Sequence, residues 1–236
     1  HRLLHVLDIH WYPEAQGGGK RITENDTSPA SIDARLQAPR SLWDPSYIET
    51  SWITQNGQKP IQLLPWLEEK IDKHYPGTQL AITEYDYGAG DHVSGGLAQA
   101  DALGVFGKNS VFMSNYWGDL KPYNKAALKI YRNYDGLKDH VGDTAVSAAS
   151  QNIIQTSIYA FTNAKTPGKL WVLVINKDQK EMVSGKFKIE GTETYRSYEA
   201  FGFDAHSPEV KALKKDHIGG DQFSYNLPPL SATLCA

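Results

Sequence analysis

The sequence predicts an α/β region with a parallel sheet over residues 1–142, followed by an all-β sandwich over residues 143–236. Two observations support this prediction. In the first region, nearly continuous apolar runs alternate with segments of helical periodicity, which is the pattern of βαβ units whose strands are covered on both faces. In the second region, short β-branched and aromatic runs are separated by Gly, Pro, Asn and Asp turns. We place the boundary near Gly142, where the pattern changes.

Each predicted element follows from a local signal. The parallel strands are the apolar runs Leu3–Trp11, Gln79–Tyr85 and Ser110–Trp117. Apolar residues at helical spacing predict helices over Pro60–His74, Gly95–Phe106 (with Ser94 as its N-cap) and Tyr123–Tyr134. The sandwich strands are predicted at Asn152–Phe161, Lys169–Asn176, Gly185–Ile189, Thr194–Ala200 and Gln222–Leu227.

The composition excludes several classes of function. The 236 residues include 24 basic and 27 acidic side chains, for a net charge of -3. This balance gives no electrostatic footprint for nucleic acid or an anionic membrane, and no run of about 18 apolar residues could span a bilayer. The single cysteine, Cys235, excludes an intrachain disulfide and a thiolate metal cage. Because the chain opens within a predicted strand and without an initiator methionine, we expect a fragment.

Polar and aromatic side chains gather where the three parallel strands end. The carboxyl ends are Asp8–Glu14, Ile82–Gly88 and Met113–Gly118. Reacting groups of parallel α/β proteins lie at this edge of the sheet. Aromatic rings stack on the apolar faces of sugars while polar groups bond the hydroxyls, so the three ends predict a carbohydrate site.

Glu84 is the candidate catalytic carboxylate. Period-two alternation places it on the face of Leu80 and Ile82, pointing inward, and His10 and Tyr12 share a face of the first strand. Two structural alternatives stay open at this point. A strand-end carboxylate can simply bond a neighbouring loop, and a histidine can be a satisfied core residue.

Four ordered motifs resemble the glycoside hydrolase family 44 endoglucanases and xyloglucanases over essentially the whole chain: Leu7–Glu14, Arg40–Tyr47, Ile82–Gly88 and Phe112–Gly118. The last segment, Leu227–Leu234, resembles the final strand of the family's β-sandwich. The resemblance implies that residues 1–142 are the C-terminal part, strands six to eight, of a (β/α)8 barrel, and that residues 143–236 form the appended sandwich. It also implies retaining hydrolysis of internal β-1,4 bonds in cellulose-type glucans, with xyloglucan, xylan and mannan as further substrates.

The resemblance also assigns roles around the nucleophile. Glu84 is expected to attack the anomeric carbon and form a glycosyl-enzyme intermediate. Tyr12 is expected to hydrogen-bond this carboxylate, with His10 in the same polar shell. Tyr85 is expected as a supporting residue beside it.

Aromatic and acidic neighbours complete the expected site. Trp117 is the expected stacking platform at the point of cleavage, and Trp11 and Trp43 are expected at flanking subsites, with core packing an equal alternative for Trp11. Asp86 is expected to order the loop that follows it or to tune Glu84. An inverting pair of Glu84 and Asp86, about 7 Å apart along one strand, is weaker because both acids approach the sugar from one side.

One part of the family pattern is absent. The acid/base glutamate is expected in an Asn-Glu pair at the end of the fourth strand, and no such pair in a strand lies upstream of His10. A barrel of about 250 residues with a sandwich of about 100 also exceeds this chain. We therefore expect the acid/base residue on a missing N-terminal half of the barrel, in the same protein or on a second chain. Secretion is expected because a polysaccharide substrate cannot enter cells.

The sequence leaves a metal site and two other functional classes as alternatives. The histidines are dispersed, so we expect neither catalytic zinc nor any catalytic cofactor. Oxygen ligands in the segment Glu14–Asp44, interpreted as a long loop, are expected to suit a structural calcium. A glycosidase of another family of the same clan is one alternative. The other is a non-catalytic carbohydrate-binding fragment that uses sandwich aromatics, namely Trp171, Tyr195, Tyr198 and Phe203.

Overall fold

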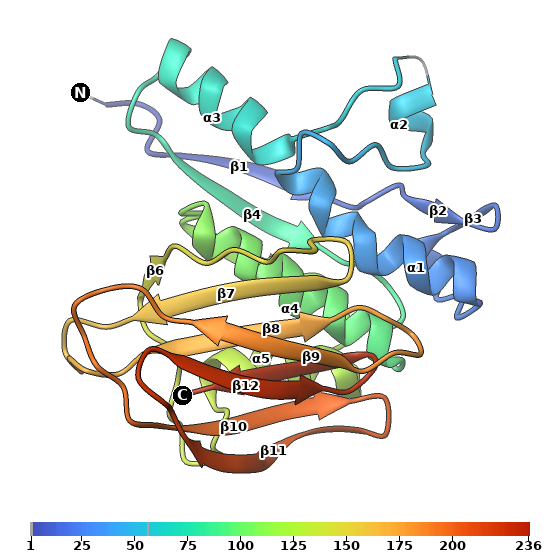
Figure 1. The fold of residues 1–236 in the computed structure, drawn as a ribbon. Helices are drawn as coiled ribbons and strands as arrows, with labels where there is room; N and C mark the ends of the chain where they lie inside the picture. Colours follow the sequence, from blue (N-terminus) through green and yellow to red (C-terminus); the bar gives the residue numbers. More distant parts are fainter. Residues whose placement is uncertain (1, 56) are drawn as a thin grey trace. The chain divides into compact units, whose positions relative to one another are not determined.

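The computed structural model describes residues 2–55 and 57–236, and the chain forms two compact units, His1–Lys121 and Pro122–Ala236 (Figure 1). The first unit is built on three parallel strands in the order β1-β4-β5, namely β1 (Val6–Trp11), β4 (Gln79–Tyr85) and β5 (Met113–Tyr116). The parallel pairing confirms the predicted βαβ pattern and the α/β class.

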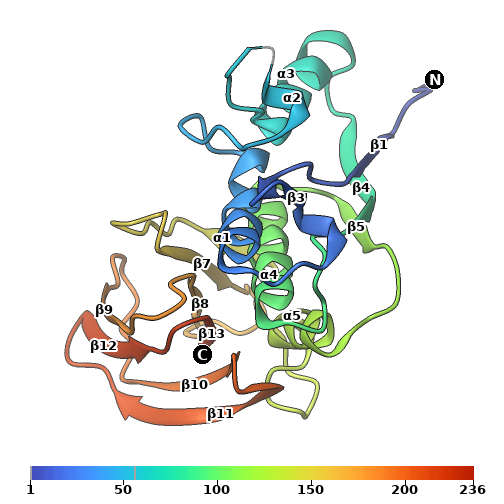
Figure 2. The ribbon, with the colours of Figure 1, turned by 90° about the vertical axis from the view of Figure 1, so that its right-hand side faces the viewer.

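Helices connect and cover these strands on one side. The connection from β1 to β4 holds β2 (Gln16–Gly17), β3 (Lys20–Arg21), the 3-10 turns η1 (Ile22–Glu24) and η2 (Ala38–Leu42), and the helices α1 (Pro29–Gln37), α2 (Trp52–Gln55) and α3 (Leu63–His74). Helix α4 (Val93–Lys108) connects β4 to β5. Figure 2 shows α1 and α4 side by side on one side of the three strands.

Three details of the first unit differ from the sequence prediction. Helix α4 begins two residues earlier than predicted, because His92 rather than Ser94 is its N-cap and its ring accepts a bond from the Ser94 amide at 3.2 Å. The segment Glu14–Asp44 is not a long loop, since most of it is α1 and the short elements around it. The outer strands are not covered on both faces, because Asp8, His10, Met113 and Asn115 are exposed on the face away from the helices.

The second unit is a three-layer arrangement around a six-stranded sheet. Its strand order is β11-β10-β13-β8-β7-β6, and a two-stranded sheet pairs β12 with β9. The elements are α5 (Pro122–Arg132), β6 (Thr144–Val146), β7 (Thr156–Thr162), β8 (Trp171–Asn176), β9 (Val183–Lys188), β10 (Ser197–Asp204), β11 (Ser207–His217), β12 (Gln222–Leu227) and β13 (Ser231–Cys235). All the sheet pairings among these strands are antiparallel, as expected for a sandwich.

Strand β8 is buried along its whole length because both faces of its sheet are covered. On one face, Trp171 donates its indole N–H to the Tyr134 hydroxyl at 3.0 Å, and aromatic side chains from α5 and the loop after it meet rings of the sheet. On the other face, Val172 and Val174 pack with Phe223 and Leu227 of β12. The continuous apolar run of β8 is therefore the sequence signature of a central strand.

Helix α5 packs against β10 and β11 and belongs to the second unit, which begins at Pro122. Sequence analysis assigns this helix to the barrel part. The predicted boundary near Gly142 stays a prediction, since it divides the chain by sequence pattern and not by compactness.

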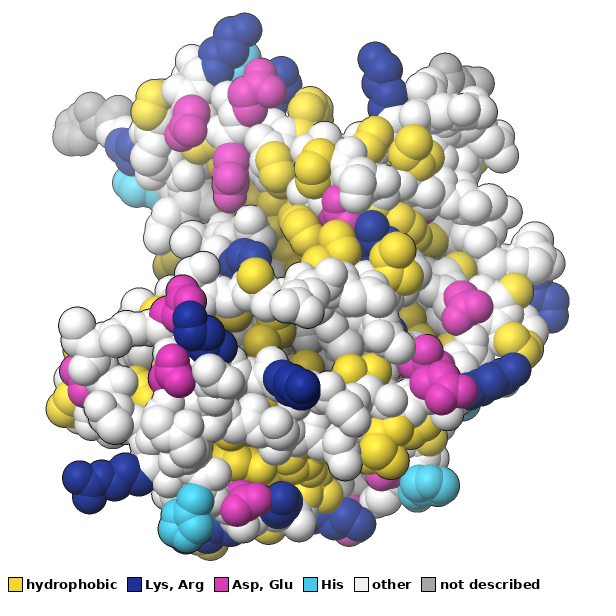
Figure 3. Space-filling view, viewed as in Figure 1, with side chains coloured by type: hydrophobic (Ala, Val, Ile, Leu, Met, Phe, Trp, Pro, Cys, Tyr) yellow, Lys and Arg dark blue, Asp and Glu magenta, His cyan; other side chains and the backbone are white. Residues whose placement is uncertain are grey.

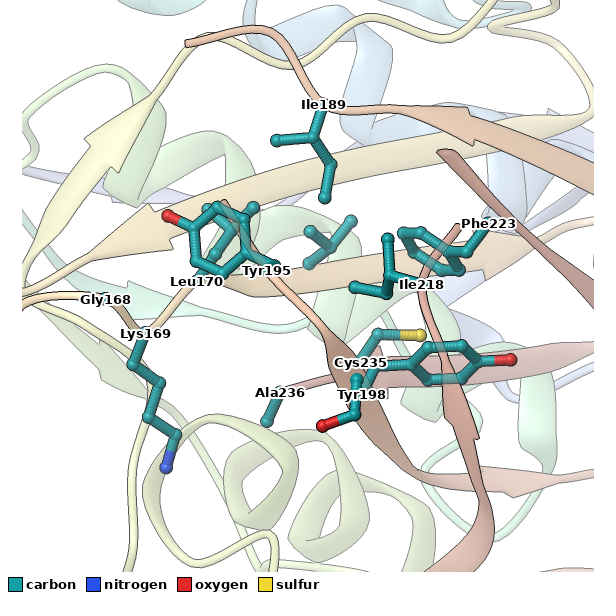
Figure 4. Close-up of a pocket in the computed structure, with 12 residues that line it drawn as sticks. Gly168, Lys169, Leu170, Ile189, Tyr195, Tyr198, Ile218, Phe223, Cys235 and Ala236 are labelled. Carbon is teal, nitrogen blue, oxygen red and sulfur yellow. The ribbon is translucent and has the colours of Figure 1, made fainter. Parts of the chain in front are cut away.

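The sandwich core is open at one end. A cavity of about 220 Å³ there is lined by Leu170, Ile189, Tyr195, Ile218 and Phe223, with Cys235 in its wall (Figure 4). Burial raises the pKa of the Cys235 thiol to about 12. The predicted alternative of an aromatic binding platform does not fit this unit, because three of its four rings are buried in the core, namely Trp171, Tyr198 and Phe203.

Charges of both signs are interspersed over the face shown in Figure 3, where no patch of one sign forms. Two tryptophans on the surface of the first unit, Trp52 and Trp66, are more than half exposed. No helix among the described residues is long and apolar enough to cross a membrane. The face shown in Figure 3 therefore agrees with the near-neutral charge balance of the sequence.

Glu49 is a buried carboxylic acid of the first unit. Its side chain is 2% exposed, and it accepts a bond from the Ser41 hydroxyl at 2.5 Å. Burial raises the pKa of Glu49 above its ordinary value of 4.5, and bonds from Ser41 and Ser51 oppose this shift only in part. Because the pKa is higher in the folded chain, the stability that Glu49 contributes is present below about pH 4.5 and lost as pH rises through the folded-state pKa.

We expect Glu49→Gln to raise the melting temperature at pH 8 by about 2–4 °C and to leave it unchanged at pH 4, since glutamine needs no ionisation penalty. Circular dichroism melts at both pH values measure the difference. The exposed Glu69, replaced in the same way, serves as the control and should show no pH-dependent difference. An equal change at both pH values would contradict the linkage argument.

Candidate active site

A β-bulge in β4 sets the direction of Glu84. Ile9 of β1 pairs with Ile82, but the next residue, His10, pairs with Glu84, so Thr83 is an extra residue. The pairing with β5 shifts at the same place, between Ile82 and Tyr85. Bulges of this kind re-aim side chains next to active sites.

The bulge corrects the predicted orientation of Glu84. In a regular strand it would share the helix-covered face of Leu80 and Ile82. The extra residue instead gives Glu84 the face of its partner His10, away from the helices. The sequence prediction that Glu84 shares a face with Leu80 and Ile82 is therefore wrong, because it assumed an unbroken period of two.

Tyr12 and His10 converge on one oxygen of Glu84. The Tyr12 hydroxyl donates to Oε2 at 3.0 Å, and Nδ1 of His10 lies 3.2 Å from the same atom. The Glu84 side chain is 26% exposed, so it is reachable from solvent. Burial and the charge of Glu84 raise the pKa of Tyr12 to about 12, and the phenol therefore stays a donor at any working pH. The alternative of a core histidine does not describe His10, which is 52% exposed. The alternative of a strand-end carboxylate bonded to a neighbouring loop stays open, because Tyr12 is the first residue after β1.

Asp86 lies beyond the end of β4 in a more buried environment. Its carboxylate accepts a bond from the Gly88 amide at 2.8 Å and interacts with the Tyr116 hydroxyl. Burial raises the pKa of Asp86, while these bonds and the charge of Arg35 oppose the shift. The contact with Gly88 agrees with the predicted ordering of the loop. Sequence analysis missed Tyr116, whose pKa is raised by burial and by Asp86.

Tyr85 lies in the core rather than beside Glu84. It is 1% exposed, its hydroxyl accepts a bond from Gln99 of α4 at 2.6 Å, and its ring meets Phe106 edge-on. Burial raises its pKa to about 12. Tyr85 was expected to support the site from a place beside Glu84. In the structure its side chain instead packs β4 against α4.

The three predicted tryptophans occupy different places. Trp117 follows β5, is 58% exposed, and its amide bonds the Tyr85 carbonyl at 3.1 Å, which places it at the carboxyl edge of the sheet. Trp11 is buried on the helix-covered face of the sheet. Of the two expectations for this residue, a subsite or core packing, the structure supports core packing. Trp43 lies against Lys108, with the ammonium 5.7 Å from its ring centre.

The position of Trp43 separates it from the other site residues. Lys108 is the last residue of α4, a helix of 16 residues that spans about 24 Å. Because α4 starts after the carboxyl end of β4 and returns to the start of β5, its last residue lies at the opposite edge of the sheet. The structure therefore does not bring Trp43 together with Glu84.

The described residues hold no group of three or more His, Cys, Asp or Glu side chains that could bind a metal ion. In the segment expected to hold calcium, three of the five acids pair with cations of the chain: Glu14 with Arg21, Asp26 with Lys20 and Asp44 with Arg40. These carboxylates do not form a calcium donor set, and calcium stays an untested expectation.

Comparison with known proteins relates the chain to glycoside hydrolases. It is 46% identical over 235 residues to endoglucanase A of Paenibacillus lautus and 42% identical over 241 residues to beta-mannanase/endoglucanase A of Caldicellulosiruptor saccharolyticus, which cover 98% and 96% of this chain. It superposes on a xyloglucanase of Paenibacillus polymyxa with a TM-score of 0.96 and 44% identity over 99% of this chain. No family model matches the chain.

Within this class, solved structures that share 43% or 44% of their residues with the chain are named as family 44 enzymes, and the resemblance predicted from the four motifs is confirmed. The chain spans 34% and 18% of the two curated relatives and 46% of the xyloglucanase chain. It therefore matches a portion of each of these enzymes.

Proposed function

We propose that this chain is the nucleophile-bearing part of a retaining endo-β-1,4-glucanase, with Glu84 as the nucleophile. The observation that carries the proposal is the placement of Tyr12 and His10 on Oε2 of Glu84, which leaves Oε1 without a recorded partner among the described residues. A carboxylate held through one oxygen at the carboxyl edge of a parallel sheet is oriented for attack through the other.

The proposed reaction proceeds in two displacements. Oε1 of Glu84 attacks the anomeric carbon, the bond to the leaving-group oxygen breaks, and the acid/base residue protonates that oxygen. Water then attacks the glycosyl ester, its proton returns to the acid/base residue, and Glu84 leaves as a carboxylate. Tyr12, held protonated, orients Glu84 throughout and needs no cofactor to do so.

The acid/base residue belongs to a further segment of polypeptide. Strands β1 and β5 are the two edges of the described parallel sheet, and we propose that this segment pairs with both edges and completes a (β/α)8 barrel, in the same protein or as a second chain. The exposed face of β1, with Asp8 and His10, then lines the interior of the barrel. In the completed cleft, Trp117 stacks on the sugar at the cleavage point. An internal β-1,4-glucan is the proposed substrate, with mannan, xylan and xyloglucan as variants, and secretion follows from the size of such a polymer.

The experiment uses the enzyme assembled with the segment that carries the acid/base residue. A 2-deoxy-2-fluoro cellobioside with a good leaving group forms a slowly hydrolysed ester with a retaining nucleophile. We expect peptide mass spectrometry to find the fluorosugar on Glu84, and proton NMR to show β-configured product first. Label on another acid would refute the assignment, and α-configured first product would refute the retaining mechanism.

A further inference from the structure

A fully buried arginine joins the segment after β3 to the loop that follows β4, the strand that carries Glu84. Arg35 of α1 is 0% exposed. Its guanidinium donates to the Ile22 carbonyl after β3, to the Tyr87 carbonyl after β4 at 3.1 Å, and to the Ser94 hydroxyl of α4 at 3.0 Å. It also donates to the Asp26 carbonyl at 3.0 Å. Burial lowers the pKa of Arg35 to about 10, which still leaves it charged at neutral pH.

Two further contacts close the same junction. Gly88 has a φ of 72°, and a Cβ there would lie 2.4 Å from the Ile22 carbonyl oxygen, so only glycine fits this approach. The next amide, of Ala89, donates to the Asn25 side chain. Arg35, Asn25 and Gly88 thus hold the segment that follows β4 against the loop before α1. We call these three residues the exit clamp.

Asp86 links the exit clamp to the cluster of Tyr12, His10 and Glu84. Arg35 holds the carbonyl of Tyr87, the residue next to Asp86. Burial raises the pKa of the Asp86 carboxyl, and the charge of Arg35 opposes this rise in part. Asp86 in turn acts on Tyr12, the donor to Glu84, because its charge helps to raise the Tyr12 pKa. A planar guanidinium can bond several carbonyls at fixed angles, whereas an ammonium cannot.

From these contacts we infer that Arg35 is a positioning residue for the reaction, which holds the exit of β4 so that Asp86, Tyr12 and Glu84 keep their mutual geometry. It touches no substrate and acts through Tyr87 and Asp86. The inference rests on the proposed function. Because catalysis depends on orientation within fractions of an ångström, a loosened exit lowers kcat more than substrate binding.

The test compares Arg35→Lys with two variants in the assembled enzyme. We expect Arg35→Lys to lower kcat about 10-fold with KM changed less than about 2-fold, measured at a temperature where it is fully folded. Arg40→Lys is the matched control, since Arg40 is also buried but pairs with Asp44 within η2 and its turn. It should lower the melting temperature and leave kcat unchanged. An unchanged kcat in Arg35→Lys would reduce Arg35 to a purely structural role and overturn the inference.

Asn25→Gly decides the question if Arg35→Lys does not fold. Asn25 is exposed and has a φ of 63°, which glycine adopts freely, so the variant removes only the side chain that binds the Ala89 amide. We expect kcat to fall about 3-fold and hydrogen exchange at Gly88 and Ala89 to rise. Unchanged kcat and exchange would overturn the inference. An inactive wild-type enzyme would instead refute the proposed function, while exchange still reports on the exit clamp.

Discussion

Glu84→Gln is expected to lower kcat on β-1,4-glucan by at least about 10³-fold in the assembled enzyme, because a neutral amide cannot attack the anomeric carbon. The shape of the residue is kept, and the Tyr12 hydroxyl can still donate to the amide oxygen. Binding of cello-oligosaccharide should therefore stay within about 3-fold of wild type, since ground-state contacts are retained. Reducing-sugar assays and calorimetry measure the two quantities.

A second substitution separates a nucleophile from a merely important acid. Glu84→Ala opens space beside the anomeric carbon, and added azide should restore turnover of an aryl cellobioside. Because azide then attacks from the side that the nucleophile occupied, in a single displacement, the product should be the α-glycosyl azide. Glu69→Gln, on the exposed side of α3, should match wild type. More than a few per cent of the wild-type rate in Glu84→Gln, or no azide product in Glu84→Ala, would contradict the assignment.

Most elements of the fold follow from local sequence signals. The strand Gln79–Tyr85 and the strand Gln222–Leu227 match the structure residue for residue, because both are short runs with clear flanking turns. Strand β11 was missed, since most of its residues are exposed and it is rich in lysine, as suits an edge strand. Its pairing with β10 comes from tertiary packing, which no local pattern reports.

The site was predictable in composition but not in geometry. The grouping of Tyr12, His10 and Glu84 follows from where two neighbouring strands end. The bulge at Thr83 could not be predicted, because the sequence around it is compatible with a regular strand. The extra residue becomes visible only in the pairing of β4 with its neighbours β1 and β5. Arg35 was missed for a related reason: its partners are backbone carbonyls, which leave no trace in side-chain patterns.

Tyr12→Phe is the second large effect that the site predicts. The substitution removes one hydroxyl and leaves the ring, so it isolates the 3.0 Å bond to Oε2 of Glu84. A hydrogen bond to a charged group contributes about 1.5–3 kcal/mol, so kcat/KM should fall about 10- to 100-fold. The fall should be carried by kcat, because the hydroxyl orients the nucleophile rather than the sugar.

Tyr75→Phe is the matched control for that measurement, since its hydroxyl also takes part in one hydrogen bond, which it accepts from the Leu3 amide at 2.9 Å. Tyr75 precedes the start of β4, whereas Glu84 lies near the end of that strand. It should keep the wild-type kcat/KM. If Tyr12→Phe stays within about 2-fold of wild type while folded, the phenol does not orient Glu84, and His10 alone must hold Oε2. A further fall in the double variant with His10→Ala, beyond the product of the single effects, would show that the two groups act on that oxygen together, because each then partly replaces the other.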